Sequence, residues 1–195
     1  LCLLSLSSGD YPYILELIDS LRGRFRDKQL FISLPSLWIG GNTIDVLRRF
    51  LDSKRPALTF APEVGSERMK RIIGKATDEE KLIEVVNFAL NRGWKKVKLY
   101  YMLGLPGLGL RDLEEMRQFL FRLLSLNTRR KVQLRLSFAT FIPKPHTPFQ
   151  WEGFKDEDVV EEQIGFIKRK LRHAGIFWEV RDYKFSMIEA VLSRG

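Results

Sequence analysis

Short apolar stretches alternate along the chain with longer segments in which apolar residues recur at helical spacing. Five such stretches come first, at residues 3–6, 30–34, 57–61, 97–103 and 133–141. Short apolar runs separated by helical segments predict β-strands joined by helices, the repeating unit of an α/β fold with a parallel sheet. A further short strand is expected at residues 176–180, followed by an amphipathic segment at residues 186–192.

Polar residues mark where several of the helices should begin. Thr77 and Glu80 have the spacing of a capping box, in which each side chain bonds a free backbone N–H of the first turn. Thr43 and Asp156 precede other helical segments and are expected to be N-cap residues.

Within each of the five strands, bulky apolar side chains alternate with small or polar ones. The apolar set is Leu4 and Leu6, Ile32 and Leu34, Leu58 and Phe60, Val97, Leu99 and Tyr101, then Leu134, Leu136 and Phe138. The polar set is Ser5 and Ser7, Ser33 and Pro35, Thr59, Ala61 and Glu63, Lys98 and Tyr100, then Gln133, Arg135 and Ser137. Because successive side chains of a strand point to opposite faces, the sheet should have one buried face and one wet face.

This difference between the faces distinguishes α/β architectures. A doubly wound sheet buries both faces, and a tightly closed eight-stranded barrel fills its interior with branched aliphatic side chains. Neither architecture predicts a polar face on five strands. An amphipathic strand at the edge of a sheet would explain the polar face of one strand only. The alternation favours a barrel with helices outside and a polar lumen that is open enough to hold a ligand.

Length and composition indicate one globular domain. The chain has 195 residues, 45% of them apolar, which suffices for one sizeable core, so we expect a single domain over residues 1–195. No apolar run reaches the roughly 18 to 20 residues of a membrane-spanning helix, and the first residues lack the basic flank of a secretion signal. We therefore expect a cytoplasmic protein without a membrane partner.

The chain is basic, with 33 lysine and arginine residues against 24 acidic residues and a net charge of +9. Such a charge attracts nucleic acid and other anions. Much of it lies in helical runs such as Arg48-Arg49, which solvated helix faces explain as well. RNA is a partner that the sequence leaves open.

Cys2 is the only cysteine. One thiol can build neither a disulfide framework nor a thiolate metal site, so we expect no metal ligands within this chain. Because the chain begins with Leu rather than Met and starts directly at the predicted strand at residues 3–6, we also expect that further motifs lie upstream.

In parallel α/β barrels the functional groups gather where the strands end, because the following loops converge on one mouth. At the first such end, Ser8 and Gly9 form a turn before Asp10, whose carboxylate suits an ammonium group or a pair of hydroxyls. Asp10 could equally cap the helix that starts near Pro12.

Glu63 follows the predicted strand at residues 57–61 and belongs to the polar set of that strand. A Gly65-Ser66 turn comes directly after it. A carboxylate there can accept hydrogen bonds from ribose hydroxyls, and an inward glutamate without a partner would be costly to bury. The alternative is an ion pair with Lys98 or Arg135, two cations on the same face.

Lys98 and Arg135 suggest a substrate carboxylate or a phosphate in the lumen, since charged hydrogen bonds hold such groups. They could instead form a structural network with Glu63. Glu63 and Lys98 could also be the acid and base of a conventional barrel enzyme.

Two further loops contain candidate residues. A Gly-Leu-Pro-Gly turn at residues 104–107 permits close backbone approach to a flat base, and the chain has no Walker sequence that would indicate a nucleoside triphosphatase. His146 lies in a proline-rich loop, where a lone histidine is more often exposed or packed than catalytic.

Three segments together resemble the radical S-adenosylmethionine (radical SAM) enzymes. They are Leu58-Thr-Phe-Ala-Pro-Glu-Val-Gly-Ser66, Lys98-Leu-Tyr-Tyr-Met-Leu-Gly-Leu-Pro106 and Phe141-Ile-Pro-Lys-Pro-His-Thr-Pro-Phe-Gln-Trp151. They are similar, in turn, to the fourth-strand region, the fifth-strand adenine-binding segment, and the sixth-strand exit of a subgroup that often carries an upstream cobalamin-binding domain. The resemblance implies a partial, open (β/α)6 barrel of the TIM type with a polar lumen. The chain would supply strands 2 to 6 of it, without the first β/α unit, and a carboxy-terminal extension from about residue 176.

The resemblance also implies cofactors and a binding site. In such enzymes a four-iron four-sulfur (4Fe-4S) cluster, held by Cys-x3-Cys-x2-Cys, reduces S-adenosylmethionine (SAM) to a 5′-deoxyadenosyl radical that abstracts hydrogen from substrate. By resemblance, SAM would contact Ser8, Gly9 and Asp10 with its amino group, Glu63 and Ser66 with its ribose or carboxylate, and Met102, Gly104, Leu105, Phe141 and Ile142 with its adenine.

The chain departs from the family at three places. The cluster cysteines are absent, Gly107-Leu108-Gly109 replaces the usual acidic residue after Gly-Leu-Pro, and Trp38 stands where arginine is common. We therefore expect a fragment, inactive by itself, of an enzyme that modifies an unidentified substrate, with RNA or protein as candidates. The alternative is a cluster-free barrel that binds an anionic ligand or RNA without redox chemistry.

Overall fold

The structure is a computed structural model that describes residues 11–26, 28, 32, 43–50, 57–75, 77–126, 132–173 and 175–194. The predicted strand at residues 3–6, and that at residues 30–34 apart from Ile32, lie outside the described residues. The helices are α1 (Ile14–Arg24), α2 (Thr43–Arg49), α3 (Glu67–Ile72), α4 (Glu79–Asn91), α5 (Leu110–Leu124), α6 (Glu157–Lys170) and α7 (Tyr183–Arg194), and the strands are β1 (Leu58–Glu63), β2 (Lys96–Leu103), β3 (Gln133–Thr140) and β4 (Ile176–Val180). Within this described part of the chain, no helix has the length and apolar character needed to span a bilayer.

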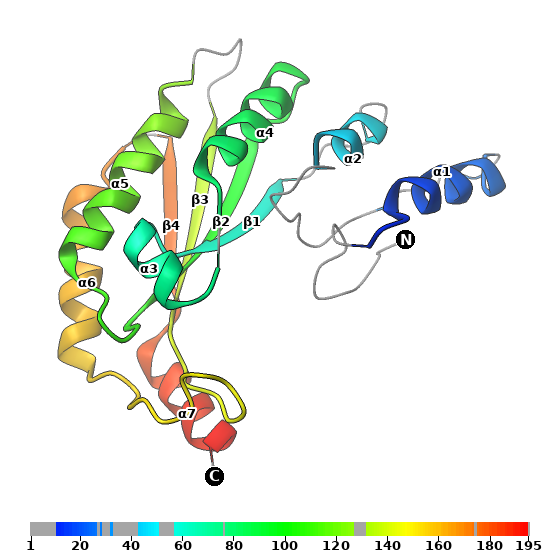
Figure 1. The fold of residues 1–195 in the computed structure, drawn as a ribbon. Helices are drawn as coiled ribbons and strands as arrows, with labels where there is room; N and C mark the ends of the chain where they lie inside the picture. Colours follow the sequence, from blue (N-terminus) through cyan, green and yellow to red (C-terminus); the bar gives the residue numbers. More distant parts are fainter. Residues whose placement is uncertain are drawn as a thin grey trace.

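The four strands form one parallel sheet in the order β1-β2-β3-β4. These are the strands that the sequence predicts, and their ends differ from the prediction by no more than two residues. Helices α4, α5 and α6, which connect successive strands, lie together on one face of the sheet (Figure 1). The described strands therefore follow one direction across the sheet, whereas a doubly wound sheet reverses its strand order.

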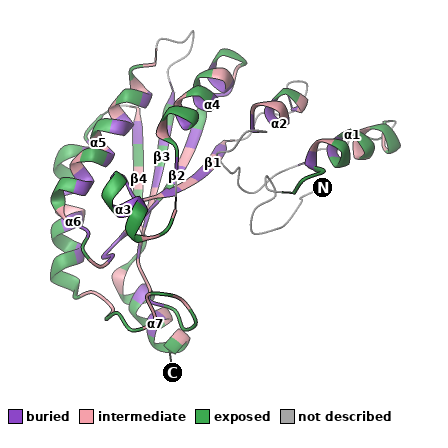
Figure 2. Cartoon of the chain, in the orientation of Figure 1, coloured by how far each residue is buried: buried purple, intermediate pink, exposed green. Residues whose placement is uncertain are grey.

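The two faces of the sheet differ in burial as their sequence predicts. In the row formed by Leu58, Val97, Leu134 and Ile176, every residue is buried. In the next row, Thr59, Lys98, Arg135 and Phe177 are half-buried or exposed. The alternation of buried and accessible positions continues along the strands (Figure 2). The predicted α/β fold with one buried and one polar sheet face is confirmed.

The buried face packs against amphipathic helices. The buried residues of α4 are Leu82, Val85, Val86, Ala89 and Leu90, and those of α5 include Leu113, Met116, Phe119, Leu120 and Leu123. Both sets recur at intervals of three and four residues, so each forms one stripe along its helix. Burying one such leucine contributes roughly 2 kcal/mol, and the core therefore holds the helices on this face.

A β-bulge interrupts the pairing of β1 with β2. Phe60 pairs with Leu99, but the next pair joins Glu63 to Tyr101, so β1 has one extra residue. Glu63 has a φ of 68°, in the left-handed region that residues other than glycine seldom adopt. Glu63 is half-buried, as the predicted alternation of β1 requires, but the bulge places it opposite buried Tyr101.

The helix starts agree with the predicted caps in part. Asp156 is the N-cap residue of α6, as predicted, and α2 begins at Thr43 itself. The N-cap residue of α4 is Asp78 rather than Thr77, because the Asp78 carboxylate accepts a hydrogen bond from the N–H of Lys81 at 3.1 Å. The predicted capping box of Thr77 and Glu80 is therefore wrong, because the N-cap residue is the next one along the chain.

Helix α7 follows β4 and packs with small side chains inward. Its buried residues are Ser186 and Ala190, whereas Phe185 and Leu192 are 65% and 80% exposed. Glu189 anchors the helix, with carboxylate oxygens 3.2 Å from Nζ of Lys144 and 2.8 Å from a guanidinium nitrogen of Arg181. The amphipathic segment predicted at residues 186–192 is thus part of a helix that presents its bulky apolar face to solvent.

Candidate functional site

The carboxyl ends of β1, β2 and β3 lie along one edge of the parallel sheet, where the sequence predicts the functional groups. Leu103 pairs with Thr140, and the N–H of Phe141 donates a 2.8 Å hydrogen bond to the carbonyl of Leu103. Gly104 and Phe141 are therefore the first residues beyond neighbouring strands. Two segments of the predicted adenine site meet at this edge.

Gly104 starts the loop between β2 and α5 in a conformation that requires glycine. Its φ is +69°, in the left-handed region. A Cβ at this position would lie 3.2 Å from Cγ2 of Val160 and 3.3 Å from Cβ of Lys155, closer than most real contacts. The first glycine of Gly-Leu-Pro-Gly is thus needed both for the turn and for close packing.

Gln163, on α6, binds both ends of the same loop. Its Oε1 accepts a 2.9 Å hydrogen bond from the N–H of Gly104, and its Nε2 donates a 3.2 Å bond to the carbonyl of Leu108. The residue is 3% exposed. The sequence contains a signal for it, a polar residue between Val160 and Ile167 on the buried stripe of α6.

Asp112, in the first turn of α5, binds the other side of the loop. Its Oδ2 accepts hydrogen bonds from the N–H of Gly109 at 2.8 Å and from Arg68 at 2.5 Å, while its Oδ1 accepts from Ser66 at 2.5 Å. The guanidinium of Arg68 also donates to the carbonyl of Gly107 at 2.7 Å. An acidic residue three positions after Gly109 is the sequence signal for this contact.

These hydrogen bonds set the charge state of Asp112. Burial by itself would raise its pKa, but the bonds from Ser66, Gly109 and Arg68 favour the carboxylate more strongly and hold the pKa below its usual value. Asp112 is therefore an anion that joins the start of α3 to the start of α5.

Ser66 has a structural role, in addition to the contact with SAM that the resemblance implied. It is the N-cap residue of α3, where its Oγ accepts a 3.1 Å hydrogen bond from the N–H of Met69 while the hydroxyl donates to Asp112. The side chain is fully buried. Ser66 thus shapes the end of β1, and in this structure its hydroxyl is fully engaged by protein groups.

Glu63 forms an ion pair, but with a different cation from those expected. Its Oε1 lies 3.1 Å from Nζ of Lys75, which follows α3. The side chains of Glu63 and Lys75 are 26% and 40% exposed, so solvent reaches both. The alternative pairs of Glu63 with Lys98 or Arg135 do not form among the described residues, where Lys98 instead lies beside Glu179.

Lys98 and Arg135 are adjacent on the polar face, where they pair in register. Lys98 lies 3.3 Å from Glu179 and has its ammonium 4.8 Å from the ring centroid of Tyr100. Tyr100 and then Glu179 hold the pKa of Lys98 above its usual value. Arg135 is exposed, and the described part of the chain supplies no partner for it.

The predicted adenine-lining residues take different positions. Met102 lies on the polar set of β2 and is half-buried, while Leu105 is 1% exposed and belongs to the core. Phe141 and Ile142 are half-buried, and the Phe141 ring meets that of Phe149 edge to face at 5.3 Å. Met102, Phe141 and Ile142 are thus accessible to a ligand, and Leu105 contributes backbone only. Ser8, Gly9 and Asp10 lie outside the described residues.

The donor set of this chain does not fit an iron-sulfur cluster. Cys2 is the only cysteine and lies outside the described residues. Among the residues that the structure does describe, no group of three or more histidine, cysteine, aspartate or glutamate side chains could hold a metal ion. A cluster needs several thiolates, so no step of its chemistry is assigned to these residues.

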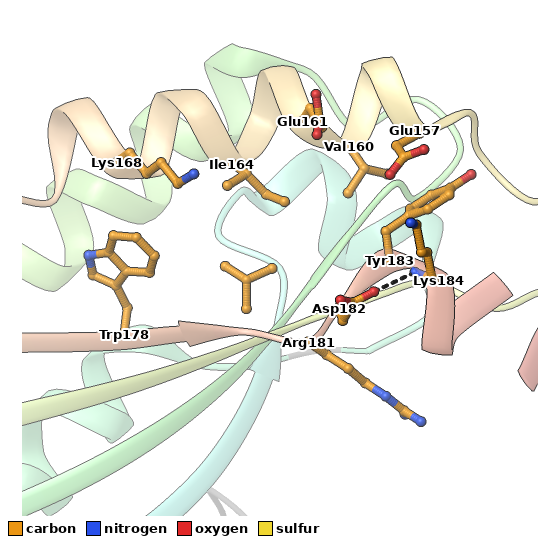
Figure 3. A pocket seen from close by; sticks show the side chains of 11 residues that line it. Glu157, Val160, Glu161, Ile164, Lys168, Trp178, Arg181, Asp182, Tyr183 and Lys184 are labelled. Carbon is orange, nitrogen blue, oxygen red and sulfur yellow. Dashed lines mark hydrogen bonds between the residues drawn. The ribbon is translucent and has the colours of Figure 1, made fainter. Parts of the chain in front are cut away.

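A hollow of about 350 Å³ lies between α6, β4 and the start of α7 (Figure 3). It is lined by Val160 and Ile164 from α6 and by Trp178 from β4, together with charged side chains such as Lys168 and Asp182 (Figure 3). Trp178 pairs with buried Leu136, so the hollow opens on the helix-covered side of the sheet. It is separate from Lys98 and Arg135, and the sequence contained no signal for it.

Comparison with known proteins adds one relative. No known protein family matches the chain. The uncharacterized protein MJ0966 of Methanocaldococcus jannaschii is 35% identical over 196 aligned residues, which cover 99% of this chain and 40% of that protein. The chain thus spans less than half the length of the relative that it matches.

Proposed function

We propose that this chain is part of a radical SAM enzyme and that the carboxyl ends of β1, β2 and β3 bind the adenosine portion of SAM. One observation carries this proposal. Adjacent parallel strands end in left-handed residues, Glu63 and Gly104, beside an open polar sheet face, and the loop after Gly104 is held from both sides. The motifs that resemble this family lie at the same strand ends.

The proposal includes a partial, open barrel. Sequential parallel strands with their connecting helices on one face are the arrangement from which barrels are built. The polar rows would then line the lumen, and the strand ends would form its mouth. We assign the remaining barrel strands, the cluster cysteines and any cobalamin-binding domain to other parts of a longer protein.

Each accessible group at this edge has a role in the proposed site. Met102, Phe141 and Ile142 supply apolar contacts to the flat adenine, which suits a mostly apolar pocket with few polar groups. The carboxylate of Glu63 accepts hydrogen bonds from the ribose hydroxyls in place of Lys75. In the proposed enzyme this chain would bind and orient the adenosine.

Binding of adenosine-containing probes tests the proposal directly. We expect the purified chain to bind SAM and 5′-methylthioadenosine in competition with each other. It should not bind the analogue of 5′-methylthioadenosine in which guanine replaces adenine. Isothermal titration calorimetry measures these affinities. Gly104→Ala should abolish binding, because the new Cβ forces the loop to move, whereas Gly23→Ala on α1 should not affect it. Absence of binding by the folded wild-type chain would refute the adenosine site.

A second candidate function is binding of an anionic ligand or RNA without redox chemistry. Arg135 favours it, because it is exposed beside Lys98 on the polar face and the described residues leave its guanidinium unpaired. Arg135→Gln should then weaken RNA binding and reduce its salt dependence without changing the affinity for 5′-methylthioadenosine. RNA binding that ignores Arg135 would argue against this candidate.

A further inference from the structure

We propose that Gln163 is a positioning residue for the adenosine site, acting from α6 through the loop between β2 and α5. The inference rests on the proposed function and deepens it. Gln163 does not meet the ligand itself. It determines the shape of the backbone that does.

The two hydrogen bonds of Gln163 use opposite ends of one amide group. The N–H of Gly104 donates to Oε1, and Nε2 donates to the carbonyl of Leu108. One planar group therefore fixes the separation of two backbone groups four positions apart in the loop. Because Gln163 is 3% exposed, water does not compete for either bond.

Other contacts hold the middle and the far end of this loop, where Leu105 packs in the core. Arg68 binds the carbonyl of Gly107 and Asp112 binds the N–H of Gly109. Gly104 itself has no side chain to hold it, and its left-handed φ of 69° is a conformation that glycine leaves readily. The hydrogen bond to Gln163 is thus a direct polar restraint on Gly104, the residue nearest the predicted adenine contacts.

Gln163 can influence a ligand only through the loop. It lies on α6, on the helix-covered side of the sheet, whereas the accessible residue Met102 lies on the polar set of β2. Gly104 is adjacent to Phe141 through the bond between Phe141 and Leu103. A shift at Gly104 therefore changes the wall that the adenine would contact.

Three variants separate positioning from plain stability. Gln163→Met keeps the length of the side chain and removes both hydrogen bonds. Gln163→Glu keeps the acceptor, and its carboxyl can donate to Leu108 only when protonated, which burial favours at mildly acidic pH. Ile167→Val, on the same buried stripe of α6, is the control that lowers stability without touching the loop.

Two measurements are made on the full chain: amide hydrogen exchange at Gly104, and the affinity for 5′-methylthioadenosine. Gln163→Met should increase exchange at Gly104 and weaken binding, each about tenfold, as expected for two lost hydrogen bonds. Gln163→Glu should bind weakly near pH 8 and recover near pH 5. The affinity of the wild-type chain is measured at the same pH values. Because it contains the same Asp112, Arg68 and Lys155, it corrects for any pH dependence that these three residues cause. Ile167→Val should match wild type at all pH values.

The outcomes distinguish the two proposals. Unchanged exchange at Gly104 in Gln163→Met would show that Gln163 does not hold the loop. Increased exchange with unchanged affinity, or no recovery of Gln163→Glu at low pH, would overturn the positioning role and leave the adenosine site standing. If wild type binds neither SAM nor 5′-methylthioadenosine, the proposed function falls, and the positioning role falls with it.

Discussion

The hydroxyl of Ser66 donates a 2.5 Å hydrogen bond to Oδ1 of Asp112, which joins residues that are 46 positions apart in the sequence. Ser66 caps α3 and Asp112 lies in the first turn of α5. This one bond therefore ties together the segments that follow β1 and β2. It is the basis of the first two predictions.

Replacing Asp112 by alanine should lower the free energy of unfolding by about 3 kcal/mol, because Ser66 and the N–H of Gly109 lose a buried acceptor. Urea denaturation measures this. The control is Asp45→Ala, which removes an exposed pair with Arg48 and should change stability by less than about 0.5 kcal/mol. Equal effects of the two substitutions would show that the Asp112 network adds no stability.

Stability should fall in acid partly through Asp112. Its folded pKa lies below its unfolded value of about 3.9, so the unfolded chain binds more protons in that range and stability is lost as pH falls through the folded pKa. Asp112→Asn should flatten this part of the pH profile below about pH 5, measured by urea denaturation. Glu114 and Glu189, whose pKa values are also lowered, remain in both proteins. A parallel decline in both would exclude Asp112 as a cause.

Two glycine substitutions should have opposite effects. A Cβ on Gly65 would collide with the backbone and Cβ of Met116 on α5, so Gly65→Ala should cost more than about 3 kcal/mol. Gly23 lies within α1 and has no atom near a new Cβ, so Gly23→Ala should raise stability by about 1 kcal/mol. Thermal unfolding of both variants provides the measurement. A stable Gly65→Ala protein would contradict the close contact of the β1 end with α5.

Glu63 and Lys75 should affect adenosine binding in opposite directions. Glu63→Gln should weaken 5′-methylthioadenosine binding about tenfold, because a charged acceptor for the ribose is lost. Lys75→Met frees the same carboxylate and should strengthen binding by a few-fold. Glu179→Gln, near Lys98, serves as the control without effect. If both Glu63→Gln and Lys75→Met weaken binding, the ion pair itself shapes the site and the ribose contact is wrong.

Thr140→Val should stabilise the protein. Oγ1 of Thr140 is buried and has no hydrogen-bond partner among the described residues, and the residue is 4% exposed. Replacing the hydroxyl by a methyl group removes an unpaired polar atom, so unfolding should require about 1 kcal/mol more. Thr59→Val, on the accessible face of β1, is the matched control and should change little. A loss of stability at Thr140 would indicate that its hydroxyl is used.

The strands were predictable because alternation is a local property. Leu134 and Leu136 are buried and Gln133 and Arg135 exposed, and this pattern follows from side-chain chemistry alone. The bulge at Glu63 was not predictable, because it depends on how many residues of β1 fall between two pairs with β2. The choice of Asp78 over Thr77 as N-cap residue depends on one backbone geometry between two suitable side chains.

The positions of the loops at the strand ends were predictable, but their contacts were not. Loops at strand ends followed from the fold, and Gly104 from its motif. The hydrogen-bond partner of Ser66 is Asp112, 46 positions away, and that of Gly104 is Gln163, 59 positions away. No local pattern specifies such pairs, although both partners are polar residues on otherwise buried helix faces.

The bulge at Glu63 also divides the sheet into parts of unequal cooperativity. β2 pairs with β3 along all eight of its residues, whereas the regular ladder between β1 and β2 ends at Phe60. Local opening of the end of β1 breaks few backbone hydrogen bonds, while opening of β2 breaks many. The backbone pairing at the end of β1 can therefore open without disrupting the ladder between β2 and β3, so any order at this corner must come from the contacts of Gly65 and Ser66 with α5.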